Sequence, residues 1–221
     1  MNLASYSFKG NRRGFPNADF SAKIRNEVTR RLVMLLKRCI FIIGGARSGK
    51  SRFAQELAAR LSERVLFVAT AEPLNPDMQV RISRHQEERS PLWQTLEAPV
   101  NLAGEIDRHF GQYEVVLIDC LTLLTSNIIL GQTRGLDDTV QIDEATAEKQ
   151  VLSEIAALLE LIKLCDATFI IVSNEVGLGL VPDNDLGRIY RDVLGRVNQS
   201  VAEFADEVNL LVAGIPLKVK G

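Results

Sequence analysis

Residues 44–51, Gly-Gly-Ala-Arg-Ser-Gly-Lys-Ser, fit the pattern G-x-x-x-x-G-K-[ST]. Glycines in such a loop let successive backbone N–H groups point at phosphate oxygens, and the helix expected to follow presents its positive N-terminal end to the same anion. Lys50 would reach the β- and γ-phosphates, and the Ser51 hydroxyl would ligate Mg²⁺. A glycine turn without a ligand is the alternative. Because the motif follows an apolar run and opens a helical pattern, we predict a nucleoside-triphosphate site.

A carboxylate at the end of a second apolar run is the expected partner of this loop. Val115–Ile118 are apolar, and Asp119 follows directly. A phosphate loop requires an acid at the end of a neighbouring strand, where it holds the hydration shell of Mg²⁺. Asp119 is also placed to cap the next helix, a role that is compatible with metal binding.

The sequence has two histidines, His85 and His109. His109 is expected near the C-terminal end of a helix. His85 lies in a charged stretch that is typical of a solvated helix face, but an imidazole is also able to attack phosphorus as a covalent nucleophile. The neighbouring Arg81, Arg84 and Arg89 offer forked donors for phosphates. From the residues alone, both interpretations of His85 stay open.

Residues 173–177, Ser-Asn-Glu-Val-Gly, directly follow the apolar run Phe169–Val172. Polar residues at the carboxyl end of a parallel strand face the ligand crevice of an open sheet. An ordinary strand-to-helix turn is the alternative.

The elements that would position these residues alternate along the chain. Short runs that are apolar on both faces predict strands of a parallel sheet covered by helices. We expect strands at Cys39–Ile43, Val65–Ala69, Val115–Ile118, Phe169–Val172 and Leu210–Ala213, and helices at Lys50–Leu61, Asp77–Glu88, Val140–Leu164 and Asn184–Ala205, with an exposed loop at Gly131–Asp138. This alternation predicts an α/β fold of the P-loop NTPase type: a three-layer α/β/α arrangement with a mainly parallel sheet of five or more strands.

Composition excludes several classes of protein. Apolar residues make up 46% and charged residues 24% of the 221, which is typical of a globular chain and not of a disordered one. The net charge of −2 gives no reason to expect a nucleic-acid binder. Three widely spaced cysteines indicate neither disulfides nor a metal site. With no apolar run long enough to span a membrane and no secretory signal, we expect a cytoplasmic protein.

The first 38 residues differ from the rest of the chain. They carry nine basic and two acidic residues, whereas residues 39–221 carry 17 basic and 26 acidic ones. We expect residues 1–38 to be a basic extension, flexible or upstream of the true start, for which Met34 is well placed. A basic arm for an acidic partner and a transit peptide are the alternatives. Residues 39–221 are expected to form a single P-loop domain.

Further blocks accompany the phosphate loop in a recognisable order: residues 68–71, Arg81-Ile82 with His85, Trp93 to Glu97, Asp119 to Thr122 with Asn127, and above all residues 174–182 and 190–199. Residues 39–220 thereby resemble the bifunctional adenosylcobinamide kinase / adenosylcobinamide-phosphate guanylyltransferase of cobalamin (vitamin B12) biosynthesis.

The resemblance implies a two-step transferase. Such an enzyme phosphorylates adenosylcobinamide with ATP or GTP, and then transfers GMP from GTP to adenosylcobinamide phosphate through a guanylyl-histidine. It implies Mg²⁺, a homotrimer, and the corrinoid and nucleoside triphosphates as substrates. His85 would be the nucleophile and Lys50 would also be catalytic; Ser51 and Asp119 would bind the metal. The nucleotide-binding set would be Gly44, Gly45, Ala46, Arg47, Ser48, Gly49, Lys50, Ser51, Ala69, Thr70, Ala71, Gln86, Glu87, Glu88, Glu97 and Asp119.

Two other functions compete with this one. In a single-function small-molecule kinase, His85 would be a surface residue. A nucleotide-dependent binding protein, such as a strand-exchange-like ATPase, would require a basic loop with aromatic residues. The loop Gly131–Asp138 has only Arg134, and the body of the chain is acidic.

Overall fold

The computed structural model describes residues 38–72, 79, 89–132 and 143–221. The first half of this chain contains strand β1 (Cys39–Gly44), helix α2 (Lys50–Leu61), strands β2 (Val65–Ala69) and β3 (Gln94–Glu97), helix α4 (Leu102–His109) and strand β4 (Val115–Asp119). The second half contains helices α5 (Leu121–Gly131) and α6 (Glu144–Leu164), strand β5 (Thr168–Asn174), helix α7 (Asp185–Phe204) and strands β6 (Glu207–Val212) and β7 (Ile215–Lys220).

The strands form one seven-stranded sheet in the order β3-β2-β4-β5-β1-β6-β7. All neighbours are parallel except β7, which pairs antiparallel with β6. The central strands are runs of Val, Ile, Leu and Phe, and nearly every residue of β1, β2, β4 and β5 is buried. Burial on both faces is what parallel strands require, because helices cover both sides of the sheet.

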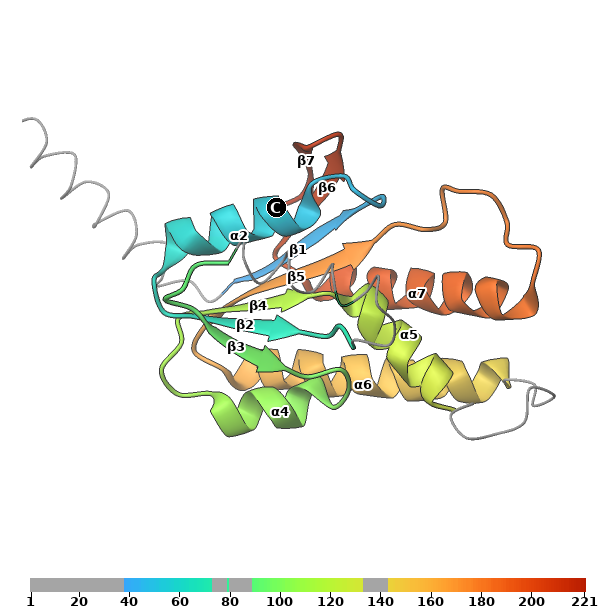
Figure 1. The fold of residues 1–221 in the computed structure, drawn as a ribbon, viewed down its shortest axis with the longest axis horizontal. Coiled ribbons are helices and arrows are strands. Elements are labelled where there is room, and N and C mark those ends of the chain that lie inside the picture. The colour runs from blue at the N-terminus through green and yellow to red at the C-terminus, as the bar shows by residue number, and fades with distance from the viewer. Residues whose placement is uncertain (1–37, 73–78, 80–88, 133–142) are drawn as a thin grey trace, which may run out of the picture.

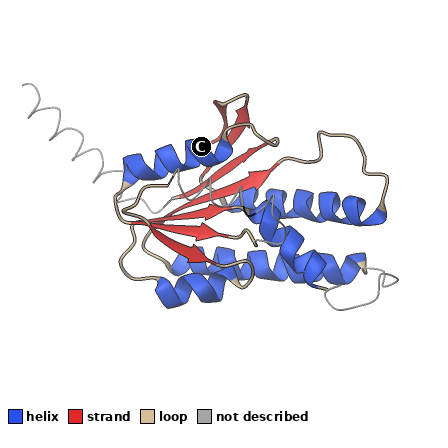
Figure 2. Ribbon diagram, viewed as in Figure 1, coloured by secondary structure: helices blue, strands red, loops and turns tan. Residues whose placement is uncertain are grey.

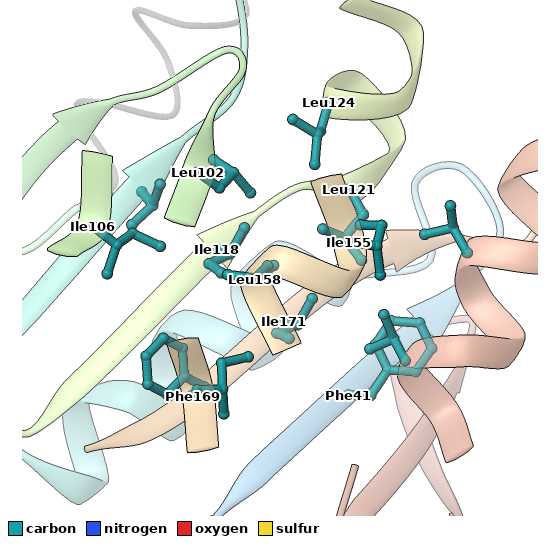
Figure 3. Close-up of a cluster of buried hydrophobic side chains, with 14 of the residues drawn as sticks. Phe41, Leu102, Ile106, Ile118, Leu121, Leu124, Ile155, Leu158, Phe169 and Ile171 are labelled. Atoms are coloured by element: carbon teal, nitrogen blue, oxygen red, sulfur yellow. The ribbon is translucent and has the colours of Figure 1, made fainter. Parts of the chain in front are cut away.

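Helices lie on both faces of the sheet, so the fold has three layers (Figures 1 and 2). Alternate strand residues pack with Ala54 and Ala58 of α2 on one face. The other strand residues, including Phe41 and Phe169, pack with the helices α4 to α7 in a larger core (Figure 3). The predicted α/β fold with a mainly parallel sheet is confirmed.

The expected strands all exist; β2 has the predicted bounds, and the ends of the others differ by one to three residues. The last one is shifted: β6 ends at Val212, and Ala213 lies in a turn with a φ of 49°. Helix α2 has the predicted bounds. Helix α7 runs one residue short at each end, because Asn184 is its N-cap and Ala205 its C-cap. Helix α6 begins at Glu144, after the capping residue Asp143.

Three elements were not predicted, and a fourth, helix α4, was expected only as a helix that ends near His109. Strands β3 and β7 lie at the two edges of the sheet and carry mostly exposed residues, so neither has the buried apolar run of a central strand. Helix α4 has only eight residues. Helix α5 is apolar nearly all round, so it lacks the 3.6-residue period of an amphipathic helix.

The helix predicted at Asp77–Glu88 lies outside the described residues apart from Gln79. The expected loop Gly131–Asp138 is wrong at its start, because Gly131 ends α5; residues 133–138 lie outside the described part.

The neighbour assumed for Asp119 was also wrong. Asp119 ends β4, and β5 lies between β4 and β1, which leads into the phosphate loop. The carboxylate is therefore two strands away from the loop. Sequence does not show this order, because β5 comes later in the chain than both strands that it separates.

The N-terminal end of the described chain is attached to the sheet. The Arg38 carbonyl accepts a hydrogen bond from the Phe169 N–H at 2.8 Å, and its guanidinium lies 3.2 Å from Glu207. Arg38, which the sequence boundary assigned to the extension, thus contacts the domain. Residues 1–37, including Met34, lie outside the described residues. Among the helices that the structure describes, none is long and apolar enough to cross a membrane.

Candidate nucleotide-binding site

The phosphate loop connects the carboxyl end of β1 to the first residue of α2, as predicted. A Cβ atom on Gly44 would lie 2.5 Å from the Leu211 carbonyl oxygen, so the start of the loop fits only glycine. Gly49 has a φ of 92°, in the left-handed region that favours glycine. The Phe53 N–H donates to the Gly49 carbonyl at 3.0 Å, which begins the helix. The N-terminus of α2 therefore opens directly onto the loop.

The turn between β6 and β7 supports the loop from behind. The Gly214 N–H donates to the Ser48 carbonyl at 2.8 Å. Ala213 and Gly214 both have positive φ angles, which is the geometry of a two-residue hairpin turn. The Ser48 hydroxyl is buried and has no hydrogen-bond partner within the described chain. A buried polar group of this kind in a phosphate loop is one that a bound anion can satisfy.

Lys50 is 7% exposed, and its Nζ donates to the Gly45 carbonyl at 2.7 Å. Burial lowers the pKa of the ammonium group, while the negative charge of nearby Asp119 acts to raise it. The cation therefore lies at the loop and within electrostatic range of the end of β4.

Glu97, Ala69 and Asp119 form one row across the sheet. Ala69 is in register with Glu97 on one side and with Asp119 on the other, and Asp119 is in register with Val172. Residues in register on neighbouring strands point to the same face. Ala69 and Val172 pack in the core beneath α2, so the two carboxylates project from the α2 face. Both acids therefore lie on the face of the sheet that α2 covers, where the phosphate loop leads into that helix.

Arg89 lies within electrostatic range of the two acids of this row, whereas the sequence indicates it only as one of three arginines near His85. Its guanidinium stacks 3.8 Å from the centre of the Phe67 ring and lies 3.5 Å from the Thr95 hydroxyl. Burial lowers the pKa of Arg89, and nearby Asp119 and Glu97 oppose that shift. In the sequence Arg89 is only four positions from His85, and no local pattern indicates that it faces Asp119 and Glu97.

Thr70 is buried, and within the described chain its hydroxyl bonds to the main chain of Cys120. It donates to the Cys120 carbonyl at 2.7 Å and accepts from the Cys120 N–H at 2.8 Å. Asn127 donates to the Thr70 carbonyl at 2.8 Å. Thr70 therefore links the end of β2 to the end of β4, and both hydrogen bonds of its hydroxyl are made to Cys120. The next residue, Ala71, is half-buried.

Cys120 directly follows Asp119, and no local sequence pattern predicts a role for its thiol. Burial, with the charge of Asp119, raises the pKa of Cys120 to about 11. It lies next to the predicted acid and within electrostatic range of Lys50. The thiol is therefore protonated at neutral pH and adds no charge beside Asp119.

Several predicted residues lie outside the described part of the chain, namely His85, Gln86, Glu87 and Glu88. His109 is the last residue of α4, as expected for a helix C-terminus. Its Nδ1 lies 2.8 Å from the Glu105 carbonyl oxygen. Because α4 leads into β4, His109 lies toward the amino end of that strand, whereas the candidate site lies at the carboxyl end.

Oxygen donors suited to Mg²⁺ are present at two points of the site. Ser51 supplies a hydroxyl in the first turn of α2, and Asp119 supplies a carboxylate at the end of β4. Such donors match the preference of Mg²⁺ for oxygen ligands, with phosphates and water completing the shell. Among the described residues, no cluster of three His, Cys, Asp or Glu side chains forms a metal site by itself.

Known proteins with similar sequences share one description. The family model "CobU: Cobinamide kinase / cobinamide phosphate guanyltransferase" matches residues 40–219. The bifunctional adenosylcobalamin biosynthesis protein CobU of Salmonella typhimurium is 39% identical over 181 residues, which cover 82% of this chain and 99% of that protein. The CobU of Escherichia coli K12 has the same identity and coverage. The CobP of Pseudomonas aeruginosa is 39% identical over 180 residues, covering 81% and 96%.

Similarity to solved structures is weaker. The ATPase EscN from the type III secretion system of enteropathogenic E. coli matches with a TM-score of 0.47 and 12% identity, over 80% of this chain and 43% of that one. That likeness adds nothing to the fold described above.

Proposed function

This chain belongs to the cobinamide kinase / cobinamide phosphate guanyltransferase family, and we propose that it carries out both reactions of that family at the site around the phosphate loop. The observation that carries the proposal is the arrangement of this site. The phosphate loop with Lys50 follows the carboxyl end of β1, and Asp119 lies at the carboxyl end of β4. The family model matches residues 40–219, which is nearly the whole domain. In detail, the substrates would be adenosylcobinamide and its phosphate, and the final products adenosylcobinamide-GDP and pyrophosphate.

In the first reaction, a hydroxyl oxygen of the cobinamide aminopropanol arm attacks the γ-phosphorus of ATP or GTP. A new P–O bond forms, the bridge to the β-phosphate breaks, and the hydroxyl proton leaves to solvent. Lys50 and the loop N–H groups hold the β- and γ-phosphates, where negative charge accumulates. Mg²⁺ held by Ser51 and Asp119 would neutralise part of that charge.

In the second reaction, a ring nitrogen of His85 attacks the α-phosphorus of GTP and releases pyrophosphate. A phosphate oxygen of cobinamide phosphate then attacks the same phosphorus, and the P–N bond to His85 breaks. The role of His85 is supported by its position in the sequence: it stands four positions before Arg89, a span of at most about 14 Å when fully extended. Arg89 lies beside Asp119 and Glu97 and is placed to hold phosphate oxygens.

The remaining parts of the proposal concern the whole protein. It would be a cytoplasmic homotrimer that binds neither nucleic acid nor membrane. Light scattering on the purified protein tests the assembly, which should have three times the chain mass of 24.5 kDa.

Product analysis with labelled nucleotide tests both activities. The protein is incubated with adenosylcobinamide, Mg²⁺ and GTP labelled in either the γ- or the α-phosphate. We expect the γ-label first in cobinamide phosphate and then, retained by the second reaction, in adenosylcobinamide-GDP, whereas the α-label should appear in adenosylcobinamide-GDP alone. The γ-label alone would reduce the function to a kinase, and neither label would refute the proposal.

A further inference from the structure

Asn174 is the last residue of β5, the strand that separates the phosphate-loop strand from the strand of Asp119. It is in register with Gly44, and Val172, two residues earlier, is in register with Asp119. Adjacent strands lie about 4.8 Å apart. Asn174 therefore lies one strand spacing from the start of the phosphate loop, and on the strand next to that of Asp119, two residues beyond the register position of this acid.

The side chain of Asn174 faces the same side of the sheet as the site. Ile170 and Val172 pack in the core beneath α2, and side chains alternate along a strand. Asn174 continues that series and projects toward the side on which the phosphate loop leads into α2. Its neighbour Ser173 projects to the opposite face and is fully buried.

The main chain of Asn174 is held on both sides. Its N–H donates to the Thr122 hydroxyl at 2.8 Å, and its carbonyl accepts from the Asn198 amide at 2.9 Å. The next residue, Glu175, donates its N–H to the Gly44 carbonyl at 2.9 Å. Strand β5 is thereby fixed against the first residue of the phosphate loop.

The carboxamide of Asn174, by contrast, makes no hydrogen bond to any residue that the structure describes, and the side chain is only half-buried. A rigid backbone that presents a free donor toward a phosphate loop is a preorganised arrangement. It acts most strongly on an atom where negative charge develops.

We propose that the Asn174 side-chain amide donates a hydrogen bond to the terminal phosphoryl group of the bound triphosphate. The inference rests on the proposed function, in which that group is transferred to the corrinoid hydroxyl. A neutral donor stabilises the negative charge on the non-bridging oxygens. Unlike a second cation, it does not compete with Lys50 for the carboxylate of Asp119. Asn174 would thus distinguish a triphosphate from a diphosphate.

Three variants test this assignment. In Asn174→Ala the donor is removed, and in Asn174→Asp an acceptor-only carboxylate of the same shape replaces it. Ser173→Ala is the control, because its buried hydroxyl has no partner within the described chain and faces away from the site. The measurements are the kcat of cobinamide phosphorylation and the affinities for GDP and for a non-hydrolysable GTP analogue.

For Asn174→Ala we expect kcat to fall about 10- to 100-fold, somewhat less than the loss of a strong transition-state donor. Affinity for the GTP analogue should fall several-fold while affinity for GDP stays within about twofold. Asn174→Asp should bind the analogue more weakly still, because a carboxylate repels phosphate. A contact that only supports the loop would weaken GDP and the analogue alike.

The assignment would be wrong if kcat and both affinities in Asn174→Ala matched those of Ser173→Ala, or if both affinities fell together. Failure of the proposed function gives a different result, since the wild-type protein would then not phosphorylate cobinamide at all. The affinities for GDP and the GTP analogue remain measurable in that case and still test whether Asn174 contacts the terminal phosphate.

Discussion

The backbone N–H of Gly214 donates to the carbonyl oxygen of Ser48 at 2.8 Å, so the turn that joins the last two strands holds the middle of the phosphate loop. A Cβ atom on Gly49 would lie 3.2 Å from the Cα of Gly214, which shows how closely the two turns approach. The last 15 residues of the chain thereby help to shape a loop that lies some 160 residues earlier. The antiparallel strand β7 has a structural role in the site although it carries none of the predicted site residues.

Replacing Gly214 by valine should weaken both the fold and nucleotide binding. Gly214 has a φ of 84°, and a non-glycine residue there costs about 1–2 kcal/mol. For a domain of this size, each kcal/mol lowers the Tm by about 2–4 °C. We also expect weaker GTP affinity, because the strained turn displaces Ser48. Thermal unfolding and nucleotide titration measure the two effects.

Gly111→Val is the matched control for that variant. Gly111 also has a positive φ, of 152°, but it lies in the loop that leads into the amino end of β4. It should lose stability and keep its affinity for GTP. Equal losses of affinity in both variants would mean that Gly214 does not act through the loop.

Replacing Lys50 by methionine should slow turnover strongly yet stabilise the protein. Burial lowers the pKa of Lys50, so the folded state binds the proton more weakly than the unfolded state, and the charged side chain costs stability at neutral pH. Methionine fills similar space without the charge. We expect kcat to fall about 100-fold or more while the Tm rises.

The control for this variant is Lys163→Met, on the exposed side of α6, where Lys163 pairs with Glu160. It should leave both activities unchanged. A Lys50→Met protein that is less stable than the wild type would show that the ammonium group contributes more to the fold than its burial costs.

Glu207 should make stability sensitive to acid. Burial acts to raise its pKa, but hydrogen bonds from Asn209 and Lys218 and the nearby charge of Arg38 outweigh that effect and hold the pKa below its ordinary value of 4.5. A carboxyl group whose pKa is lowered by folding contributes stability above its unfolded value, and loses it as the pH falls through the folded value.

Glu207→Gln should therefore lower the Tm at pH 7, and the difference from the wild type should shrink as the pH falls below about 4.5. Glu63→Gln, at an exposed position after α2, is the control. A Tm difference for Glu207→Gln that is constant with pH would contradict the ion-pair account.

Sequence predicted the central strands and the phosphate loop because both depend on local patterns. Val65–Ala69 is apolar on both faces, and the glycines and Lys50 of the loop stand at fixed spacing. It did not predict edge strands such as Gln94–Glu97, whose pairing depends on a distant partner. Nor did it show that β5 separates Asp119 from the loop, or that Arg89 faces Asp119 and Glu97. Those relationships arise from the order of strands in the sheet, which local residue patterns do not encode.

The central claim is that this phosphate loop presents GTP to a nucleophilic histidine. The most direct test is intact-mass spectrometry of the protein after incubation with GTP and Mg²⁺, without corrinoid. We predict an acid-labile gain of one GMP in the wild type that maps to His85, and none in His85→Asn, which should still phosphorylate cobinamide. An adduct that persists in His85→Asn, or no adduct in a protein that forms adenosylcobinamide-GDP, would contradict the account.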